Sequence, residues 1–273
     1  MIKLENTEII GWEAAIRGMR NPMNSWEKSD SFLCREVEDG TCPEDCSFRG
    51  KCPVYGTEDF FVLGDNDYTL MKNLRNAGTD HRKFMRMITV YVDITAPLYW
   101  WKEFDTYKVG TVANSCSTMH KIAAKEFTLE DFSCEHLMSF DNSNYWEEDS
   151  DNACFIDPGK KEVVVPMSLI LNYIIPMLNV ARDKYNEASK KLKRIDLTEA
   201  ERKHVMAQKK LFWWQMIQLL PSSYNQRRTV MLNYEVLANI YKSRKNHKLD
   251  EWREFCAWIK TLPYHEIITG EEK

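Results

Sequence analysis

The sequence predicts a mixed α/β (α+β) fold in which a small sheet accompanies long helices. Two long segments, 166–194 and 198–219, are expected to be helical. Two short segments, 89–95 and 229–232, are rich in β-branched residues, a composition typical of strands. The chain has 273 residues, which is enough for one large domain or two small ones and for a sizeable core.

The first part of the chain is expected to alternate between helix and insertion. Apolar residues recur at helical spacing over 7–20, and again between Leu70 and Ile88. Between these segments, residues 28–60 carry several glycines and prolines together with four cysteines. Such a composition predicts an inserted loop.

The strand expected over 89–95 leads directly into a helix. Pro97 stands where proline is favoured, in a first helical turn, so we expect the helix to begin at Leu98 and reach Phe104. Small and polar residues follow over 106–117 and predict a loop.

The two long helices carry their own signals. Pro176 lies inside the first of them and is expected to kink it. Thr198 and Glu201 have the spacing of a capping box, which predicts the start of the second. A polar insertion over 140–162 precedes both helices.

The C-terminal part is expected to be helical after the strand at 229–232. Asn233 can cap a helix that reaches about Ser243. A last helix is expected over 249–262, where Pro263 ends it.

Charge and hydropathy exclude several classes of protein. A net charge of −4 and a pI of about 5.9 argue against a dedicated DNA- or RNA-binding surface. No apolar run approaches the roughly 20 residues that span a bilayer, and the N-terminus lacks an apolar signal core. We therefore expect a cytoplasmic protein, whose eight cysteines are reduced thiols or metal ligands rather than disulfides.

Four cysteines in the first insertion form a candidate metal site. Cys34, Cys42, Cys46 and Cys52 have the spacing C-x7-C-x3-C-x5-C. Four thiolates can bind Zn tetrahedrally and would staple a loop that is too polar to form its own core. An iron–sulfur cluster and unpaired reduced thiols are the alternatives.

Two segments carry a resemblance to a known family. The first runs from Val92 through Ala96-Pro97 to Lys108, and the second comprises Leu220-Pro221 followed by Asn233, Leu237 and Arg244. Their order and spacing resemble the flavin-dependent thymidylate synthases. This resemblance implies a small antiparallel sheet with long helices, in a single domain over 1–273.

The resemblance also implies an activity. Such enzymes methylate dUMP at C5; methylenetetrahydrofolate gives the carbon, and FAD reduced by NADPH supplies hydride. They are homotetramers with active sites at subunit interfaces. The substrate expected for this chain is dUMP or a related pyrimidine nucleotide.

The family's signature loop is strongly altered in this chain. Its eight fixed positions fall on Thr106, Tyr107, Lys108, Thr111, Ala113, Asn114, Cys116 and Thr118, and none is identical. The resemblance assigns cofactor contacts to His81, Thr106, Tyr107, Lys108 and Asn233. It assigns substrate contacts to Glu103, Thr111, Asn114, Cys116, Thr118 and Arg244.

The altered loop has lost two arginines, which are the usual bidentate ligands of phosphate. Arg244 matches the family's arginine that grips the pyrimidine nucleotide. The family's other arginine, just before Leu-Pro, is Ile217 here, and the nearby Arg227 and Arg228 could substitute for it in substrate binding. The alternative is that all three arginines are solvated surface cations.

Cys116 is the candidate catalytic residue. It occupies the position of the family's second serine, near the pyrimidine, where a thiolate could attack C6. A reactive thiolate needs a pKa lowered by a nearby cation, and Lys108, His120 and Lys121 are close in sequence. The alternative is an inert near-isosteric replacement of serine.

Three functions compete at this point. The first is an active flavin-dependent thymidylate synthase or a close relative. The second keeps the fold and binds a nucleotide or flavin without methylation, as the altered loop would allow. The third is a non-enzymatic interaction protein on this fold.

Overall fold

A computed structural model describes most of the chain. The described residues are 2–34, 60–137, 155–157, 162–164 and 167–270.

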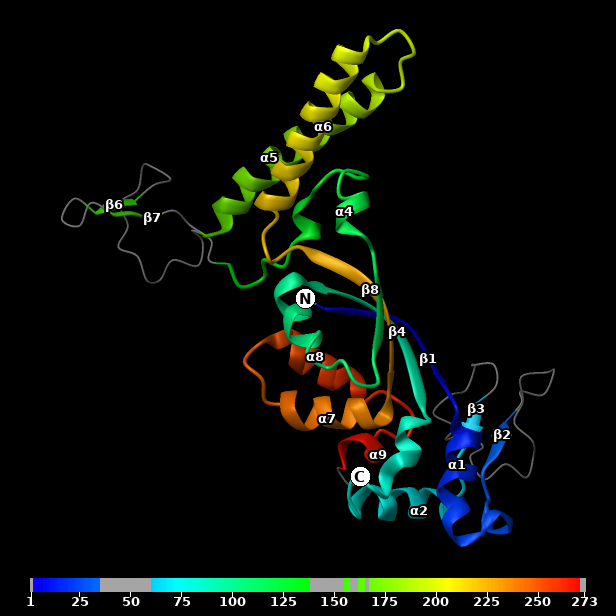
Figure 1. Ribbon diagram of the computed structural model, residues 1–273. Coiled ribbons are helices and arrows are strands. Elements are labelled where there is room, and N and C mark those ends of the chain that lie inside the picture. Colours follow the sequence, from blue (N-terminus) through cyan, green and yellow to red (C-terminus); the bar gives the residue numbers. More distant parts are fainter. Residues whose placement is uncertain (1, 35–59, 138–154, 158–161, 165–166, 271–273) are drawn as a thin grey trace, which may run out of the picture. The chain divides into compact units, whose positions relative to one another are not determined.

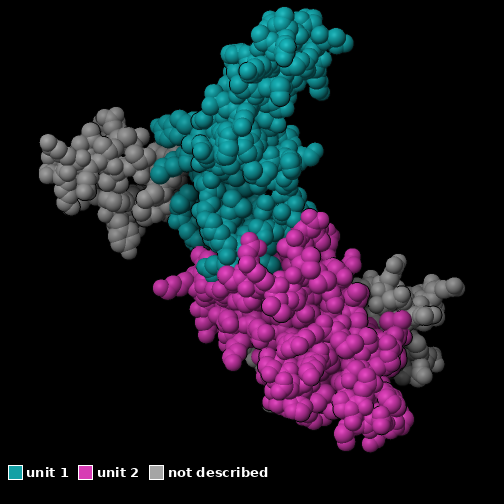
Figure 2. All heavy atoms as spheres, in the orientation of Figure 1, with its two compact units in different colours: residues 1, 95–104, 115–228 teal, residues 2–94, 105–114, 229–273 magenta. Residues whose placement is uncertain are grey.

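The chain forms two compact units, each assembled from separate segments (Figure 2). Unit 1 contains Thr95–Phe104 and Ser115–Arg228, and unit 2 contains Ile2–Ile94, Asp105–Asn114 and Thr229–Lys273. Each unit is described by itself below. The single domain expected from the resemblance stays a prediction.

Most of the residues of a four-stranded sheet belong to unit 2 (Figure 1). The strand order is β1-β4-β8-β5. The strands are β1 (Lys3–Ile10), β4 (Thr89–Pro97), β8 (Asn225–Asn233) and β5 (Val112–Ser115). Alternate residues of β4 are buried, among them Val90, Val92 and Ile94, so one face of this strand packs on the core. The small antiparallel sheet with long helices is therefore confirmed.

Two short antiparallel pairs lie outside this sheet. In the first, β2 (Phe32–Cys34) pairs with β3 (Phe60–Val62), with Leu33 opposite Phe61. In the second, β6 (Phe155–Asp157) pairs with β7 (Glu162–Val164). The first pair has β2 within the insertion expected over 28–60 and β3 at its end. The second has β6 within the insertion expected over 140–162 and β7 at its end.

The helix expected over 7–20 is wrong for its first residues. Lys3–Ile10 form strand β1, and helix α1 covers only Trp12–Arg20. Gly11 separates the two with a φ of 95°, and a Cβ there would lie 2.1 Å from the carbonyl oxygen of Met87. Sheet pairing of the backbone has overridden a local side-chain spacing that suits a helix.

The helices of unit 2 build most of its core. They are α1, α2 (Asp65–Asn76), the 3-10 helix η3 (Arg82–Arg86), α7 (Tyr234–Arg244), α8 (Asp250–Ile259) and α9 (Glu266–Thr269). Trp252 and Phe255 of α8 and Leu237 and Ile240 of α7 are completely buried. At about 1.5–3 kcal/mol for each fully buried large apolar side chain, these residues stabilise the unit substantially.

Asn233 couples strand β8 to helix α7. It is the last residue of β8, and its side-chain oxygen accepts a hydrogen bond from Val236 N at 3.0 Å. The cap expected at this position is therefore confirmed, and it fixes the point from which α7 projects.

A buried ion pair anchors the segment that leads into the cysteine-rich insertion. Asp67 of α2 is fully buried and accepts a hydrogen bond from Arg20 Nε at 2.6 Å. The same carboxylate accepts hydrogen bonds from Ser29 Oγ at 2.7 Å and Ser31 Oγ at 2.6 Å, and from the backbone N–H of Asp30 at 3.2 Å. The Asp67 carboxylate thereby holds three consecutive residues, Ser29, Asp30 and Ser31, in place.

Unit 1 contains the two long helices. Helix α5 spans Met167–Lys191 with Pro176 inside it, and α6 spans Glu199–Leu219. The two lie side by side as a helical hairpin (Figure 1). Leu178 and Met216, one from each helix, are fully buried in a shared apolar cluster.

The capping box expected for α6 is confirmed. Thr198 Oγ1 accepts a hydrogen bond from Glu201 N at 3.3 Å, and the Glu201 carboxylate accepts one from Thr198 N at 2.9 Å. These bonds satisfy two of the backbone donors that a helix start leaves unpaired.

Unit 1 also holds the short helices that flank the signature loop. Helix α3 spans Leu98–Phe104, as expected, and α4 spans Thr118–Lys121. Within the expected polar loop over 106–117, residues Val112–Ser115 form strand β5, which is exposed along its whole length. The loop expectation is wrong there because backbone pairing with β8 does not require apolar side chains.

None of the described helices is both long and apolar enough to cross a bilayer.

Candidate functional site

Arg244 lies at the centre of a polar and aromatic cluster in unit 2. Its Nε donates a hydrogen bond to Tyr107 Oη at 2.9 Å, and its Nη1 lies 2.9 Å from His247 Nε2. Its guanidinium carbon lies 4.7 Å from the ring centre of Trp252. We call Tyr107, Arg244, His247 and Trp252 the Arg244 cluster.

The aromatic members of the Arg244 cluster also contact one another. Tyr107 and Trp252 pack edge to face, with ring centres 5.9 Å apart, and His247 packs on Trp252 at 6.3 Å. Trp252 is completely buried, whereas Arg244 is half-buried. A cation held over the face of a buried indole is attracted by the ring quadrupole. The cluster thus fixes Arg244 by both hydrogen bonds and stacking.

The loop after α3 lies against the start of α7. Gly110 has a φ of +77°, and a Cβ there would approach Asn233 Nδ2 at 3.0 Å and Val236 Cγ2 at 3.1 Å. The Thr111 hydroxyl donates a hydrogen bond to the carbonyl oxygen of Tyr107. These contacts bring the residues expected at 107, 111 and 233 together with Arg244 in unit 2.

The remaining expected site residues of unit 2 are accessible. Thr106, Lys108 and Asn114 are exposed, and so is His81, which precedes the 3-10 helix η3. The roles assigned to these residues stay predictions.

Two of the expected residues of unit 1, Cys116 and Arg227, meet near the start of β8. Cys116 is exposed; its backbone N–H donates to the carbonyl oxygen of Arg227 at 3.0 Å, and its carbonyl oxygen accepts from Gln226 Nε2 at 3.0 Å. Arg227 is exposed, while Glu103 and Thr118 are partly buried. The structure therefore places Cys116, the residue after β5, next to Arg227 of β8 through this backbone hydrogen bond.

Arg228 is held in place by two other residues of unit 1. Its guanidinium stacks on the Trp101 ring, 4.1 Å from the ring centre, and its Nε donates to Gln226 Oε1 at 2.9 Å. Trp101 is buried, and its indole N–H donates to the carbonyl oxygen of Gln226 at 2.9 Å. These contacts position Arg228 in a way that the sequence did not indicate.

The metal site expected at the four cysteines is untested. Cys34 ends strand β2, and Cys42, Cys46 and Cys52 lie outside the described residues. Among the residues that the structure does describe, no group of three His, Cys, Asp or Glu side chains could hold a metal ion.

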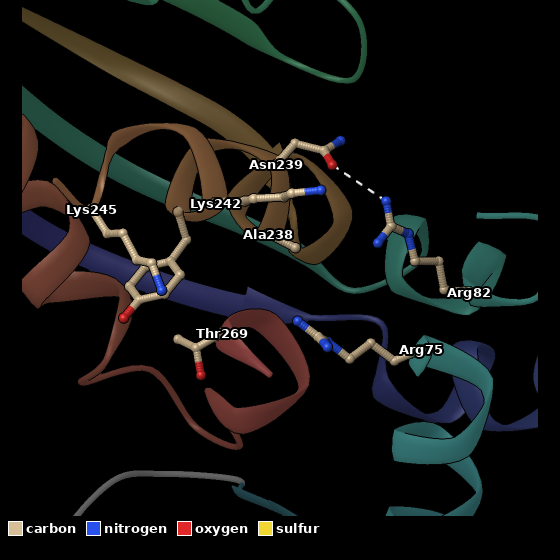
Figure 3. A pocket seen from close by; sticks show the side chains of 8 residues that line it. Arg75, Arg82, Ala238, Asn239, Lys242, Lys245 and Thr269 are labelled. Atoms are coloured by element: carbon tan, nitrogen blue, oxygen red, sulfur yellow. Dashed lines mark hydrogen bonds between the residues drawn. The ribbon is translucent and has the colours of Figure 1, made fainter. Parts of the chain in front are cut away.

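A cationic cavity in unit 2 was not indicated by any sequence motif (Figure 3). It measures about 350 Å³, and we call it the basic pocket. Its polar lining comprises Arg75, Arg82, Asn239, Lys242, Lys245 and Thr269. Among the described residues that line it, none carries a negative charge.

A carboxylate beside the basic pocket orients one of its arginines. Glu235 accepts hydrogen bonds from Arg82 Nε at 3.3 Å and from Arg86 Nε. Burial alone would raise the pKa of Glu235, but the bonds and charges of Arg86 and Arg82 hold this pKa below its ordinary value. Glu235 is therefore a stable anion that fixes the Arg82 guanidinium.

Two crystal structures of thymidylate synthase X (ThyX) from Helicobacter pylori, both with FAD and dUMP, are similar to this chain. One is 13% identical, with a TM-score of 0.53, and the match covers 99% of this chain and 98% of that chain. The other is 15% identical, with a TM-score of 0.52, and the match covers 99% of this chain and 100% of that chain.

A third structure, the UMP/dUMP methylase PolB from Streptomyces cacaoi with 5-Br UMP, is 12% identical. Its TM-score is 0.43, and the match covers 99% of this chain and 95% of that chain. No protein-family model and no curated protein matches the sequence. The likeness to ThyX nonetheless extends over nearly the whole of both chains. The chain therefore has the fold of the flavin-dependent thymidylate synthases.

Proposed function

We propose that this chain binds a pyrimidine nucleotide such as dUMP and methylates its base at C5. Methylenetetrahydrofolate is the proposed carbon donor, and FAD reduced by NADPH is the proposed hydride donor. The proposed assembly is a homotetramer. The fold shared with ThyX, whose structures contain FAD and dUMP, supports this class of reaction.

The hydrogen bond between Arg244 and Tyr107 carries the proposal. The two residues are 137 positions apart and belong to the two segments on which the resemblance rests. Their meeting in the fold is what a shared nucleotide site requires. Arg244 is the proposed phosphate ligand, because a guanidinium offers a planar fork of donors to phosphate oxygens.

The donors around the 105–111 loop fit the phosphates of a flavin. Lys108 supplies a cation and Thr106 a hydroxyl, both exposed, and Gly110 holds the loop backbone against Asn233. We propose that these residues, together with His81 and Tyr107, hold FAD. When bound, FAD supplies the hydride, and the protein orients the base for it.

Further substrate contacts are proposed from the resemblance. They comprise Glu103, Thr111, Asn114, Cys116, Thr118, Arg227 and Arg228. Of these, Arg228 is held by Trp101 and Gln226, so it presents a fixed charge rather than a mobile one. A fixed charge loses little side-chain entropy when it binds an anion.

An absorbance spectrum of the purified protein tests the proposal directly. We expect flavin absorbance to survive desalting after FAD is added, and dTMP to form from dUMP once NADPH and methylenetetrahydrofolate are present. A protein that retains no flavin, with or without dUMP, would contradict the flavoenzyme proposal.

Replacement of Cys116 with serine distinguishes two routes to the product. If flavin performs the chemistry, Cys116→Ser is expected to retain most of the methylation activity, because a hydroxyl replaces a thiol of similar size. Activity is measured as dTMP formation at saturating dUMP, with flavin content as the control. Complete loss of activity at normal flavin content would instead support a thiolate nucleophile.

Binding of a nucleotide or flavin without methylation is the second candidate. The signature loop keeps none of the family's eight fixed residues, although Lys108 keeps a positive charge and Thr111 a hydroxyl. Loss of the catalytic pattern with donors retained favours this candidate. Tight binding of FAD and dUMP without dTMP formation is the outcome that would distinguish it.

A further inference from the structure

The basic pocket concentrates positive charge from three separate stretches of unit 2. Arg75 comes from α2 and Arg82 from η3, while Lys242 lies in the last turn of α7 and Lys245 directly follows that helix. All four side chains are labelled around the cavity in Figure 3. Like charges gathered around one cavity repel each other, so their arrangement costs free energy unless an anion neutralises them.

Neutral oxygens orient Arg75 at the end of α9. Its Nε donates to the carbonyl oxygen of Ile267 at 3.1 Å and its Nη2 to that of Ile268 at 3.3 Å. Gly270 follows with a φ of +71°, and a Cβ there would come within 2.2 Å of the guanidinium. A side chain at position 270 would be strained at this φ and would displace the Arg75 guanidinium.

Arg75 also responds to the charge around it. Burial lowers its pKa, and the neighbouring Arg82 lowers it further. The acceptors bonded to Arg75 are carbonyl and amide oxygens, which orient a guanidinium but carry no full negative charge. Arg82 donates to Asn239 Oδ1 at 3.3 Å (Figure 3) and is also paired with the Glu235 carboxylate at 3.3 Å, so its charge is partly offset.

We propose that the basic pocket binds a diphosphate, either free or esterified, at a site separate from Arg244. Four cations match an anion that carries several charges better than they match a single phosphate. A cavity of about 350 Å³ is within the range of small-molecule sites. None of the four cations is among the residues to which the resemblance assigns a cofactor or substrate contact.

Titration calorimetry of the full chain with inorganic pyrophosphate at low salt tests the proposal. The test variant is Lys242→Gln with Lys245→Gln, since both lysines are exposed and line the pocket. The matched control is Lys3→Gln with Lys248→Gln, which removes the same charge from exposed positions outside the lining. We expect at least about a tenfold loss of affinity in the test variant and little change in the control.

A second pair of measurements separates this site from the proposed nucleotide site. The proposal does not rest on the proposed function, so pyrophosphate affinity is expected to survive Arg244→Ala. Affinity for dUMP is expected to survive the change of Lys242 and Lys245. Loss of pyrophosphate binding in Arg244→Ala, or equal losses in the test and control variants, would overturn the proposal.

The source of the diphosphate is identified by parallel titrations with ADP and FAD. Tighter binding of either than of pyrophosphate assigns the pocket to an esterified diphosphate, provided that the lysine variant loses it. Tighter binding of pyrophosphate assigns the pocket to a free anion. A wild-type protein that binds none of the three more tightly than the lysine variant contradicts the proposal.

Discussion

Replacement of Arg244 with alanine is expected to weaken dUMP binding by more than about tenfold, or roughly 1.4 kcal/mol. A hydrogen bond to a charged group contributes about 1.5–3 kcal/mol, and the guanidinium is already held in place by Tyr107 and Trp252. Its removal costs both the charge and this pre-organisation. Isothermal titration with dUMP measures the change.

Three variants sharpen this test. Arg244→Lys keeps the charge but loses the fork, so we expect a loss close to that of alanine. Tyr107→Phe removes the acceptor of the 2.9 Å hydrogen bond and is expected to have a smaller effect. Arg253→Ala, on exposed α8 surface, is the control for loss of a cation. Unchanged dUMP affinity in Arg244→Ala would remove Arg244 from the site.

Replacement of Asp67 with alanine is expected to lower the free energy of unfolding by about 3–5 kcal/mol. Arg20 is 4% exposed and Asp67 is fully buried, so the variant leaves a buried cation without its partner. The variant also leaves two serine hydroxyls and one backbone N–H without the carboxylate to which they donate hydrogen bonds. Chemical denaturation followed by tryptophan fluorescence measures the loss.

A surface ion pair provides the comparison. Asp250→Ala removes the partner of Arg253 at an exposed site, where such a pair contributes about 0–1 kcal/mol. The paired change Arg20→Met with Asp67→Leu removes both buried charges and is expected to be less harmful than Asp67→Ala alone. Equal effects of Asp67→Ala and Asp250→Ala would show that the buried pair contributes little.

Asp67 also predicts how stability depends on pH. Burial alone would raise its pKa, but hydrogen bonds from Ser31, Ser29 and Arg20 hold the pKa below the ordinary value. A carboxyl group with a lower pKa in the folded state stabilises the fold above its unfolded pKa of about 3.9, and this contribution is lost as the pH falls through the folded pKa. The Asp67→Ala variant should therefore differ less from the wild type in acid than at neutral pH.

The parts of the fold that the sequence predicts are those with local signals. Thr198 with Glu201, and Asn233 before an apolar run, mark helix starts through hydrogen bonds made within four residues. Such bonds need no knowledge of the rest of the chain. Strands β4 and β8 were likewise expected, at 89–95 and 229–232, although β4 extends to Pro97 and β8 already begins at Asn225.

The missed features depend on contacts between distant segments. His247 belongs to no sequence motif, yet it lies 2.9 Å from Arg244 Nη1. The basic pocket is another case, since Arg75 and Thr269 both line it although they lie far apart in the sequence. A single sequence carries no spacing rule for side chains that only tertiary packing brings together.

Unit 2 combines an early segment of the chain with the last one, so it cannot be completed until the last segment has been synthesised. Ile2–Ile94 emerge from the ribosome first, but their partners in this unit include Thr229–Lys273. At about 5–20 residues per second, roughly 7–27 s pass between Ile94 and Thr229. Throughout that interval the nascent chain lacks Tyr234 and Tyr264, whose rings pack on Trp12, so this early apolar surface must be shielded by other means.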